Sequence, residues 1–186
     1  PVDAVIPRLN EALTLGAAAI LVAEPGAGKT TRVPLKLLGS SWLGDKKIVM
    51  LEPRRLAARA AAKRMAETLD EEIGATVGYT VRLDRKVTAK TRIEVVTEGI
   101  LTRRLQHDPE LKDTGLIIFD EFHERSLNGD LGLALTLDMR QGLREDLRLL
   151  IMSATLDAAK LSEHLQGASV IQASGRMFPV ETRYLG

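Results

Sequence analysis

The sequence contains no cysteine and few aromatic residues. Without cysteine it can form neither disulfides nor thiolate metal sites, and its three histidines are scattered, which argues against a structural metal. An aromatic content of 3% leaves little material for stacking nucleic-acid bases. A single strand that binds here is therefore expected to be held through its backbone.

Long apolar runs and a strong net charge are also missing. No run approaches the roughly 18 apolar residues of a membrane span, and no signal segment opens the chain. We therefore expect a soluble, cytoplasmic protein with no membrane partner. The formal net charge of +1 predicts no whole-molecule attraction to nucleic acid, so such binding must come from local basic clusters.

The chain does contain a glycine-rich turn between an apolar run and a helical pattern. Residues 18–22 are apolar, and residues 28–38 are expected to form a helix. Between them, Gly26 and Gly28 let successive backbone N–H groups turn inward, while the helix N-terminus adds unpaired donors and a positive dipole end. This arrangement predicts a loop that binds the phosphates of a nucleoside triphosphate.

The residues that follow fit the same chemistry. Lys29 would place its ammonium on the β- and γ-phosphates, and the Thr30 hydroxyl would complete the shell of a Mg²⁺ ion. Ala27 and Thr31 complete the predicted nucleotide-binding stretch. The usual pattern opens with glycine, but this chain has Ala23; we interpret the change as tolerated because this position closes the strand.

Strand and helix patterns alternate along the whole chain. The expected strands cover residues 18–22, 46–51, 76–83, 92–97, 116–119, 147–152 and 170–171, and the expected helices cover 2–13, 28–38, 53–69, 100–106, 127–142 and 157–165. The polar residues 84–86 are expected to form a loop. This alternation predicts an α/β fold with a mainly parallel sheet, which binds its ligands beyond the carboxyl ends of the strands.

The helix predicted over residues 53–69 has an apolar and a basic face. Pro53 would open it, because a missing N–H costs nothing in the first turn. The apolar stripe is Ala57, Ala61, Met65 and Leu69, and the basic face is Arg55, Arg59 and Lys63. For Arg59 and Lys63, a solvated basic face remains an open alternative to an anion site.

An acidic pair follows the most apolar strand, residues 116–119. Asp120 would hold Mg²⁺ through water, and Glu121 would lie at the metal and deprotonate the attacking water. Such a pair often marks a solvated turn, but here it accompanies a phosphate loop and a buried strand, which favours catalysis. His107 and His164 are interpreted as structural or surface residues.

Six short motifs, in this order, carry a specific resemblance. They are Gly-Ala-Gly-Lys-Thr-Thr (26–31), Glu-Pro-Arg-Arg-Leu-Ala-Ala-Arg (52–59), Val-Gly-Tyr-Thr-Val-Arg (77–82), Thr-Glu-Gly-Ile-Leu (97–101), Asp-Glu-Phe-His-Glu-Arg-Ser (120–126) and Ser-Ala-Thr (153–155). The series resembles the first RecA-like lobe of superfamily 2 helicases of the DEAH type. Phe122 replaces the alanine of the DEAH tetrad, and this variant is similar to the bacterial HrpB helicases in particular.

The resemblance implies roles for residues that spacing alone does not assign. His123, Ser153 and Thr155 would couple the nucleotide state to the nucleic-acid groove. The residues that would touch the phosphodiester backbone of a single strand are Arg54, Arg55, Thr97 and Gly99. Arg64 matches an arginine that stacks on the base of the nucleotide.

The resemblance also implies a longer protein. Residues 1–174 would be the ATP-binding RecA-like domain, and residues 175–186 would begin a connector to a second lobe. The chain starts without methionine and stops directly after an extended segment, which suggests an excised piece. Because the arginine-rich motif of the second lobe has no counterpart in this sequence, we expect the chain alone to bind nucleotide and hydrolyse it feebly; an arginine finger contributes about 10³- to 10⁵-fold in rate.

The expected function is therefore that of an ATP- and Mg²⁺-dependent helicase lobe acting on a single strand, which we expect to be RNA, although no residue in the sequence distinguishes RNA from DNA. Two alternatives stay open. One is a nucleic-acid-binding or scaffold protein with a vestigial nucleotide site. The other is a phosphoryl-transfer kinase, which would leave the Pro-Arg-Arg and Ser-Ala-Thr stretches unexplained.

Overall fold

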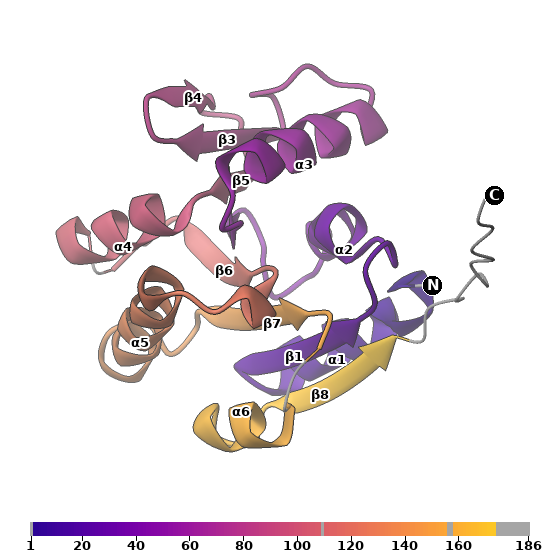
Figure 1. Cartoon of the computed structure of the whole chain (residues 1–186), viewed down its shortest axis with the longest axis vertical. Coiled ribbons are helices and arrows are strands. Elements are labelled where there is room, and N and C mark those ends of the chain that lie inside the picture. Colours follow the sequence, from indigo (N-terminus) through magenta and orange to yellow (C-terminus); the bar gives the residue numbers. More distant parts are fainter. Residues whose placement is uncertain (1, 109, 156–157, 174–186) are drawn as a thin grey trace, which may run out of the picture.

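The computed structural model describes residues 2–108, 110–155 and 158–173 (Figure 1). Within these residues, eight strands form one sheet in the order β4-β3-β5-β2-β6-β7-β1-β8. The strands are β1 (Ala18–Ala23), β2 (Lys47–Leu51), β3 (Val77–Val81), β4 (Asp84–Lys86), β5 (Ile93–Val96), β6 (Thr114–Phe119), β7 (Arg148–Ser153) and β8 (Ser169–Ala173). All neighbours are parallel except β3 and β4, so the expected α/β fold with a mainly parallel sheet is confirmed.

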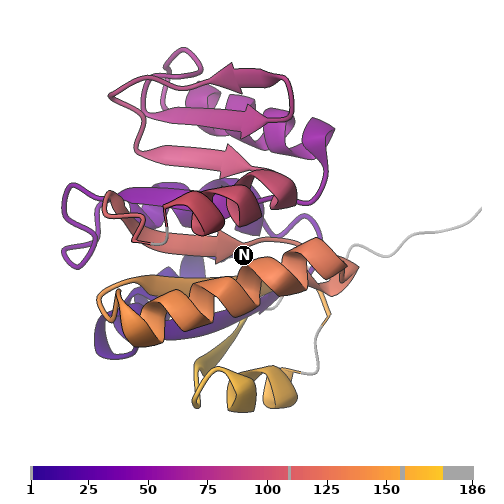
Figure 2. The same ribbon diagram turned by 90° about the vertical axis from the view of Figure 1, so that its left-hand side faces the viewer.

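Helices cover both faces of this sheet (Figure 2). One face carries α1 (Ile6–Leu15), α2 (Lys29–Leu37) and α3 (Arg55–Thr68), and the other carries α4 (Glu98–His107), α5 (Leu127–Gly142) and α6 (Ala158–His164). Two short 3₁₀ turns, η1 (Val2–Val5) and η2 (Phe122–Glu124), complete the elements. None of the helices in the described part of the chain is both long and apolar enough to cross a bilayer.

The sheet separates the core into two layers, and the side chains of the central strand β6 contribute to both. Leu116 and Ile118 pack with the layer beneath α1, α2 and α3, whereas Ile117 and Phe119 pack with the layer beneath α4 and α5. Successive side chains of a strand point to opposite faces, so a strand covered on both faces must be apolar throughout. The burial of all six residues of β6 follows from this.

Three details of the expected elements are wrong. Residues 84–86 form β4, an antiparallel edge strand whose register pairs Tyr79 with Lys86. Its charged residues resemble a loop because an edge strand exposes its side chains to water. Residues 2–5, expected as the start of the first helix, form the separate turn η1.

The third difference concerns α3, which begins at Arg55 and not at Pro53. Arg54 is extended, with φ −105° and ψ 126°, and serves as the N-cap. The buried stripe is also rotated by about one residue: it consists of Ala58, Ala61, Ala62, Met65 and Ala66. Leu69 is 37% exposed. The predicted domain end at residue 174 and the connector over 175–186 lie outside the described residues.

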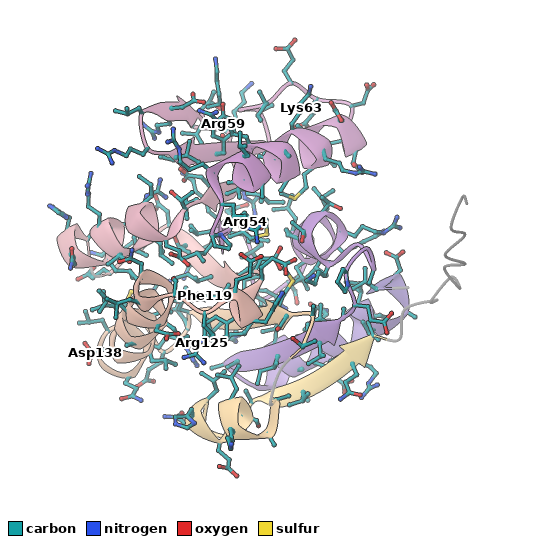
Figure 3. The ribbon with its side chains drawn as sticks, viewed as in Figure 1. Arg54, Arg59, Lys63, Phe119, Arg125 and Asp138 are labelled. Atoms are coloured by element: carbon teal, nitrogen blue, oxygen red, sulfur yellow. The ribbon has the colours of Figure 1, made fainter. Side chains whose placement is uncertain are left out.

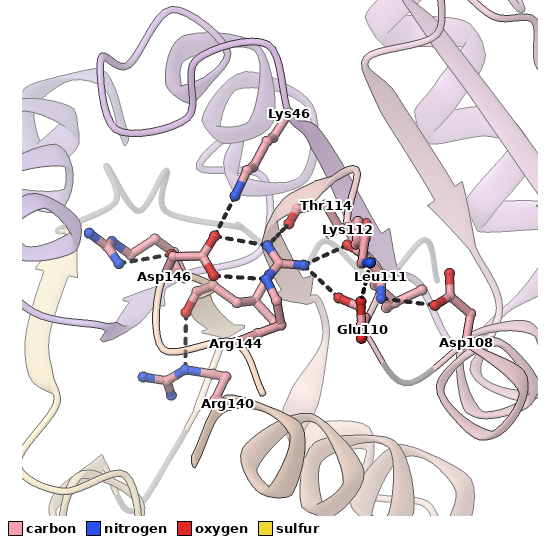
Figure 4. A network of polar contacts seen from close by, with 11 residues as sticks. Lys46, Asp108, Glu110, Leu111, Lys112, Thr114, Arg140, Arg144 and Asp146 are labelled. Carbon is pink, nitrogen blue, oxygen red and sulfur yellow. Dashed lines mark hydrogen bonds and ion pairs between the residues drawn. The ribbon is translucent and has the colours of Figure 1, made fainter. Parts of the chain in front are cut away.

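A buried guanidinium ties together the starts of the strands (Figure 4). Arg144 is 7% exposed and donates hydrogen bonds to the carbonyl oxygens of Glu110, Leu111 and Thr114 at 2.6 to 2.8 Å. It also binds both carboxylate oxygens of Asp146, at 2.7 and 2.9 Å. Arg144 thereby holds the pKa of the Asp146 carboxyl well below its usual range, although burial opposes this, and Lys46 assists.

The predicted functional motifs lie at the carboxyl ends of the strands, opposite the end that Arg144 holds. Five neighbouring strands, β5, β2, β6, β7 and β1, are parallel and therefore end at the same edge. The segments that follow them are 97–99, 52–55, 120–126, 153–155 and 24–30. Motifs far apart in the sequence are thus brought side by side.

Candidate nucleotide and nucleic-acid site

The phosphate loop links β1 to α2 through two left-handed glycines. Gly26 has φ +80° and Gly28 has φ +90°, which is a backbone region that other residues rarely adopt. A Cβ on Gly28 would also lie 2.8 Å from Cδ of Arg32. Both glycines are therefore required by the backbone path, and Lys29 follows as the first residue of α2.

The loop meets the acidic pair at Lys29. The Lys29 ammonium, on a residue that is 3% exposed, lies 2.8 Å from Oε1 of Glu121. The two residues come from different segments, after β1 and after β6, and β7 is the one strand between them in the sheet. The predicted approach of the phosphate loop to the acidic pair is thus present in the fold.

Asp120 is the most deeply buried acidic residue of this site, with 1% exposure. Its Oδ1 accepts a hydrogen bond from the Glu121 amide at 2.8 Å, whereas its Oδ2 is buried and has no hydrogen-bond partner among the described residues. Burial raises the pKa of Asp120 to about 6; the nearby Thr30 hydroxyl opposes this rise, and the charge of Glu121 adds to it. A buried carboxylate oxygen without a donor is a group that a cation would satisfy.

Glu121 has a strained backbone. Its φ of +49° and ψ of 37° lie in the left-handed region, which is costly for a side chain of this size. The turn aims the carboxylate back at two partners, since Oε1 faces Lys29 and Oε2 lies 3.3 Å from Nε2 of His123. The sequence motif predicts this residue, but its conformation is visible only in the structure.

His123 connects Glu121 to the segment after β7. The Ala154 amide donates to Nδ1 of His123 at 3.3 Å, and the Ser153 hydroxyl lies at the same distance. Because Nδ1 accepts that amide hydrogen, the proton of the neutral ring belongs on Nε2, the nitrogen that faces Glu121. The buried Ser153 hydroxyl also donates to the Thr155 carbonyl oxygen at 2.9 Å, which places Thr155, itself exposed, at the end of this chain.

The predicted strand-binding residues lie at helix starts on the same edge. Arg54 binds both carboxylate oxygens of Glu124, and Arg55 donates to the Arg82 carbonyl oxygen at 3.2 Å. Thr97 is the N-cap of α4 but makes no capping bond with its side chain. A Cβ on the exposed Gly99 would meet nothing within 4 Å.

The structure separates the other basic residues of α3 from this group. In Figure 3, Arg54 lies toward the centre of the view, whereas Arg59 and Lys63 lie along the upper part of the molecule. Arg59 is paired with Asp84 at 2.7 Å and lies over the Tyr79 ring, so it supports the β3–β4 hairpin. Arg64, predicted to stack on the nucleotide base, is exposed on α3.

Sequence reasoning missed three polar residues of the site. Glu52, which ends the run before Pro53, is 3% exposed; burial, followed by the charge of Asp120, raises its pKa to about 8. Glu98 accepts a 2.6 Å hydrogen bond from the Ser126 hydroxyl, and Glu124 holds Arg54. All lie within the quoted motifs, but a sequence does not show which side chain faces which.

Comparison with known proteins agrees with the resemblance to DEAH-type helicases that the sequence motifs carry. The family model described as DEAD/DEAH box helicase matches residues 4–164. The chain is 57% identical over 185 residues to the ATP-dependent RNA helicase HrpB of Escherichia coli (strain K12), covering all of this chain and 23% of that protein. It is 39% identical over 168 residues to the probable ATP-dependent RNA helicase DHR2 of Saccharomyces cerevisiae, covering 89% of this chain and 23% of that one.

A solved structure agrees with the sequence matches. The crystal structure of the Escherichia coli DEAH/RHA helicase HrpB matches with a TM-score of 0.92 and 57% identity, over 100% of this chain and 24% of that one. The chain thus spans about a quarter of the length of the HrpB relative. The resemblance to DEAH-type helicases, and to HrpB among them, is confirmed: this chain belongs to the DEAD/DEAH box helicase family.

Proposed function

We propose that this chain is the ATP-binding lobe of an ATP-dependent RNA helicase. In this proposal it hydrolyses ATP to move along or unwind RNA when it is joined to a second RecA-like lobe. The observation that carries the proposal is the 2.8 Å contact between Lys29 and Glu121, next to a buried carboxylate oxygen of Asp120 that has no hydrogen-bond partner in the described part of the chain. The relatives named as ATP-dependent RNA helicases favour RNA as the strand, and we propose a bacterial cytoplasm as the setting.

In the proposed site the loop N–H groups of residues 26–30 cradle the phosphates, with Lys29 on the β- and γ-phosphates. The ammonium can exchange its contact with Glu121 for phosphate oxygens of higher charge. Glu121 is then free to orient and deprotonate the attacking water. Arg64, at the surface of α3, is proposed to lie against the base.

The donor set fits a magnesium ion held jointly with the nucleotide. Within the described residues there is no cluster of three or more histidine, cysteine or acidic side chains that could hold a metal alone. Mg²⁺ usually takes one or two protein oxygens and completes its shell with water and phosphate. Thr30 and Asp120 would hold the ion, which would neutralise charge on the phosphates. Both oxygens of Glu121, also predicted as a ligand, already contact Lys29 and His123.

A titration with a fluorescent ATP analogue and Mg²⁺ tests the nucleotide site. We expect Lys29→Ala to weaken binding about 10- to 100-fold, as for the loss of a charged hydrogen-bond donor. Lys36→Ala, at an exposed position of the same helix α2, is the matched control and should bind as the unchanged chain does. Equal affinities of the Lys29 variant and the control would contradict the proposal and favour a scaffold with a vestigial site.

A further inference from the structure

Arg54 and Glu124 form a bidentate salt bridge beside the candidate nucleotide site. Nε of Arg54 donates to Oε2 at 3.1 Å, and Nη2 donates to Oε1 at 2.6 Å. The carboxylate thus accepts hydrogen bonds from the edge of the planar guanidinium that carries Nε and Nη2. Nη1, on the outward side, has no hydrogen-bond partner among the described residues.

The exposure of the two side chains shows which one faces outward. The Arg54 side chain is 70% exposed and the Glu124 side chain is 30% exposed. Arg54 therefore presents its unpaired edge to solvent while the carboxylate supports it from behind. An unsupported arginine samples many rotamers, and ordering its side chain on binding costs conformational entropy.

Glu124 also belongs to the segment that carries the catalytic acid pair. Its backbone N–H donates to the Glu121 carbonyl oxygen at 2.9 Å, which closes the turn η2. The same turn holds His123, whose ring reaches Glu121 and the segment after β7. The carboxylate that holds Arg54 thus lies on the same turn that places Glu121 against Lys29.

We propose that Glu124 is a positioning residue for single-strand binding: it holds the Arg54 guanidinium so that its free edge faces a backbone phosphate. The inference rests on the proposed function, because it takes Arg54 as a phosphate contact. It makes a prediction opposite to that of simple electrostatics. Removing a negative charge next to a polyanion should tighten binding, whereas losing the support of Arg54 should weaken it.

The test measures binding of a fluorescein-labelled single-stranded oligouridylate to the full chain, by anisotropy at fixed salt. We expect Glu124→Gln to weaken binding about 2- to 10-fold, the range that corresponds to ordering one side chain. The matched control is Asp130→Asn, which removes the same charge from a carboxylate that binds Arg125 in the same bidentate way. The control should bind equally or more tightly.

A third variant separates this inference from the function it rests on. Arg54→Gln should weaken strand binding, and adding Glu124→Gln to it should change nothing further. If Glu124→Gln alone tightens binding, or if its loss persists without Arg54, the positioning role is wrong while the strand site stands. If Arg54→Gln binds as the unchanged chain does, Arg54 is not a phosphate contact, and the assignment of the strand site fails together with the inference.

Discussion

At the scale of single residues, the fold raises the pKa of Glu52 further than that of the neighbouring Asp120. Glu52 follows β2, and its carboxyl is buried beside that of Asp120. The folded chain raises the pKa of Glu52 from 4.5 to about 8, so at neutral pH the folded state holds a proton here that the unfolded state has lost. Between these two values the free energy of unfolding must therefore fall as the pH rises.

Glu52→Gln should remove this pH dependence, because an amide stays neutral throughout. We expect the variant to gain stability relative to the unchanged chain as the pH rises from 5 to 8, by on the order of 2 kcal/mol at the upper end. The measurement is the unfolding midpoint in denaturant at several pH values. Glu72→Gln, at an exposed position, is the control and should give a constant difference over this range.

At the scale of elements, α4 contains a glycine that its own helix does not need. Gly99 lies in the first turn, is exposed, and has open space where a Cβ would be. Glycine inside a helix costs roughly 0.5–1 kcal/mol relative to alanine. No contact within the described residues accounts for that cost, and the proposed approach of a single strand to this helix start would account for it.

Gly99→Ala should therefore raise stability and weaken strand binding at the same time. We expect the melting temperature to rise by about 2–4 °C and the affinity for a labelled single-stranded RNA to fall. Gly142→Ala is the matched control, since Gly142 ends α5 with equally open space around its Cβ. It should leave RNA binding unchanged. Unchanged RNA affinity of the Gly99 variant would remove Gly99 from the strand site.

Elements that depend on local sequence patterns could be predicted, whereas pairings between distant segments could not. The strand β6, the turn with Gly26 and Gly28, and the acidic pair after β6 are local patterns, so they could be predicted. The edge strand β4 was missed because its role depends on a partner strand and not on its own composition. The pairing of Arg54 with Glu124 joins residues 70 positions apart, and no periodicity in either segment reports it.

For the whole molecule, the buried Arg144 network and the candidate site lie at opposite ends of the strands. Arg144 ties strand starts together at one edge, while the predicted nucleotide and strand residues follow the strand ends at the other (Figures 1 and 4). Arg144 lies outside all six motifs of the sequence. Its importance follows from burial and from three carbonyl oxygens that depend on it.

Arg144→Met should destabilise the chain by about 3–5 kcal/mol, because Asp146 and the carbonyl oxygens lose a buried donor. The midpoint of chemical unfolding should fall while its slope stays the same. Lys46→Met, which removes the half-exposed partner of Asp146, should cost less than about 1 kcal/mol. Under conditions in which both variants are folded, their ATP affinities should match that of the unchanged chain; a weaker affinity would show that the two edges are not independent.

Within the part of the chain that the structure describes, Oδ2 of Asp120 is buried with no hydrogen-bond partner. Substituting asparagine there replaces a carboxylate that burial disfavours with a neutral group of nearly the same shape, so the damaged molecule should fold at least as well as the intact one. Under the proposed function such a copy would be inactive but folded, and a folded copy would escape the degradation that removes unfolded chains. Such copies would compete with active copies for the same single strands. The activity of the remaining active protein would then fall because its strands are occupied.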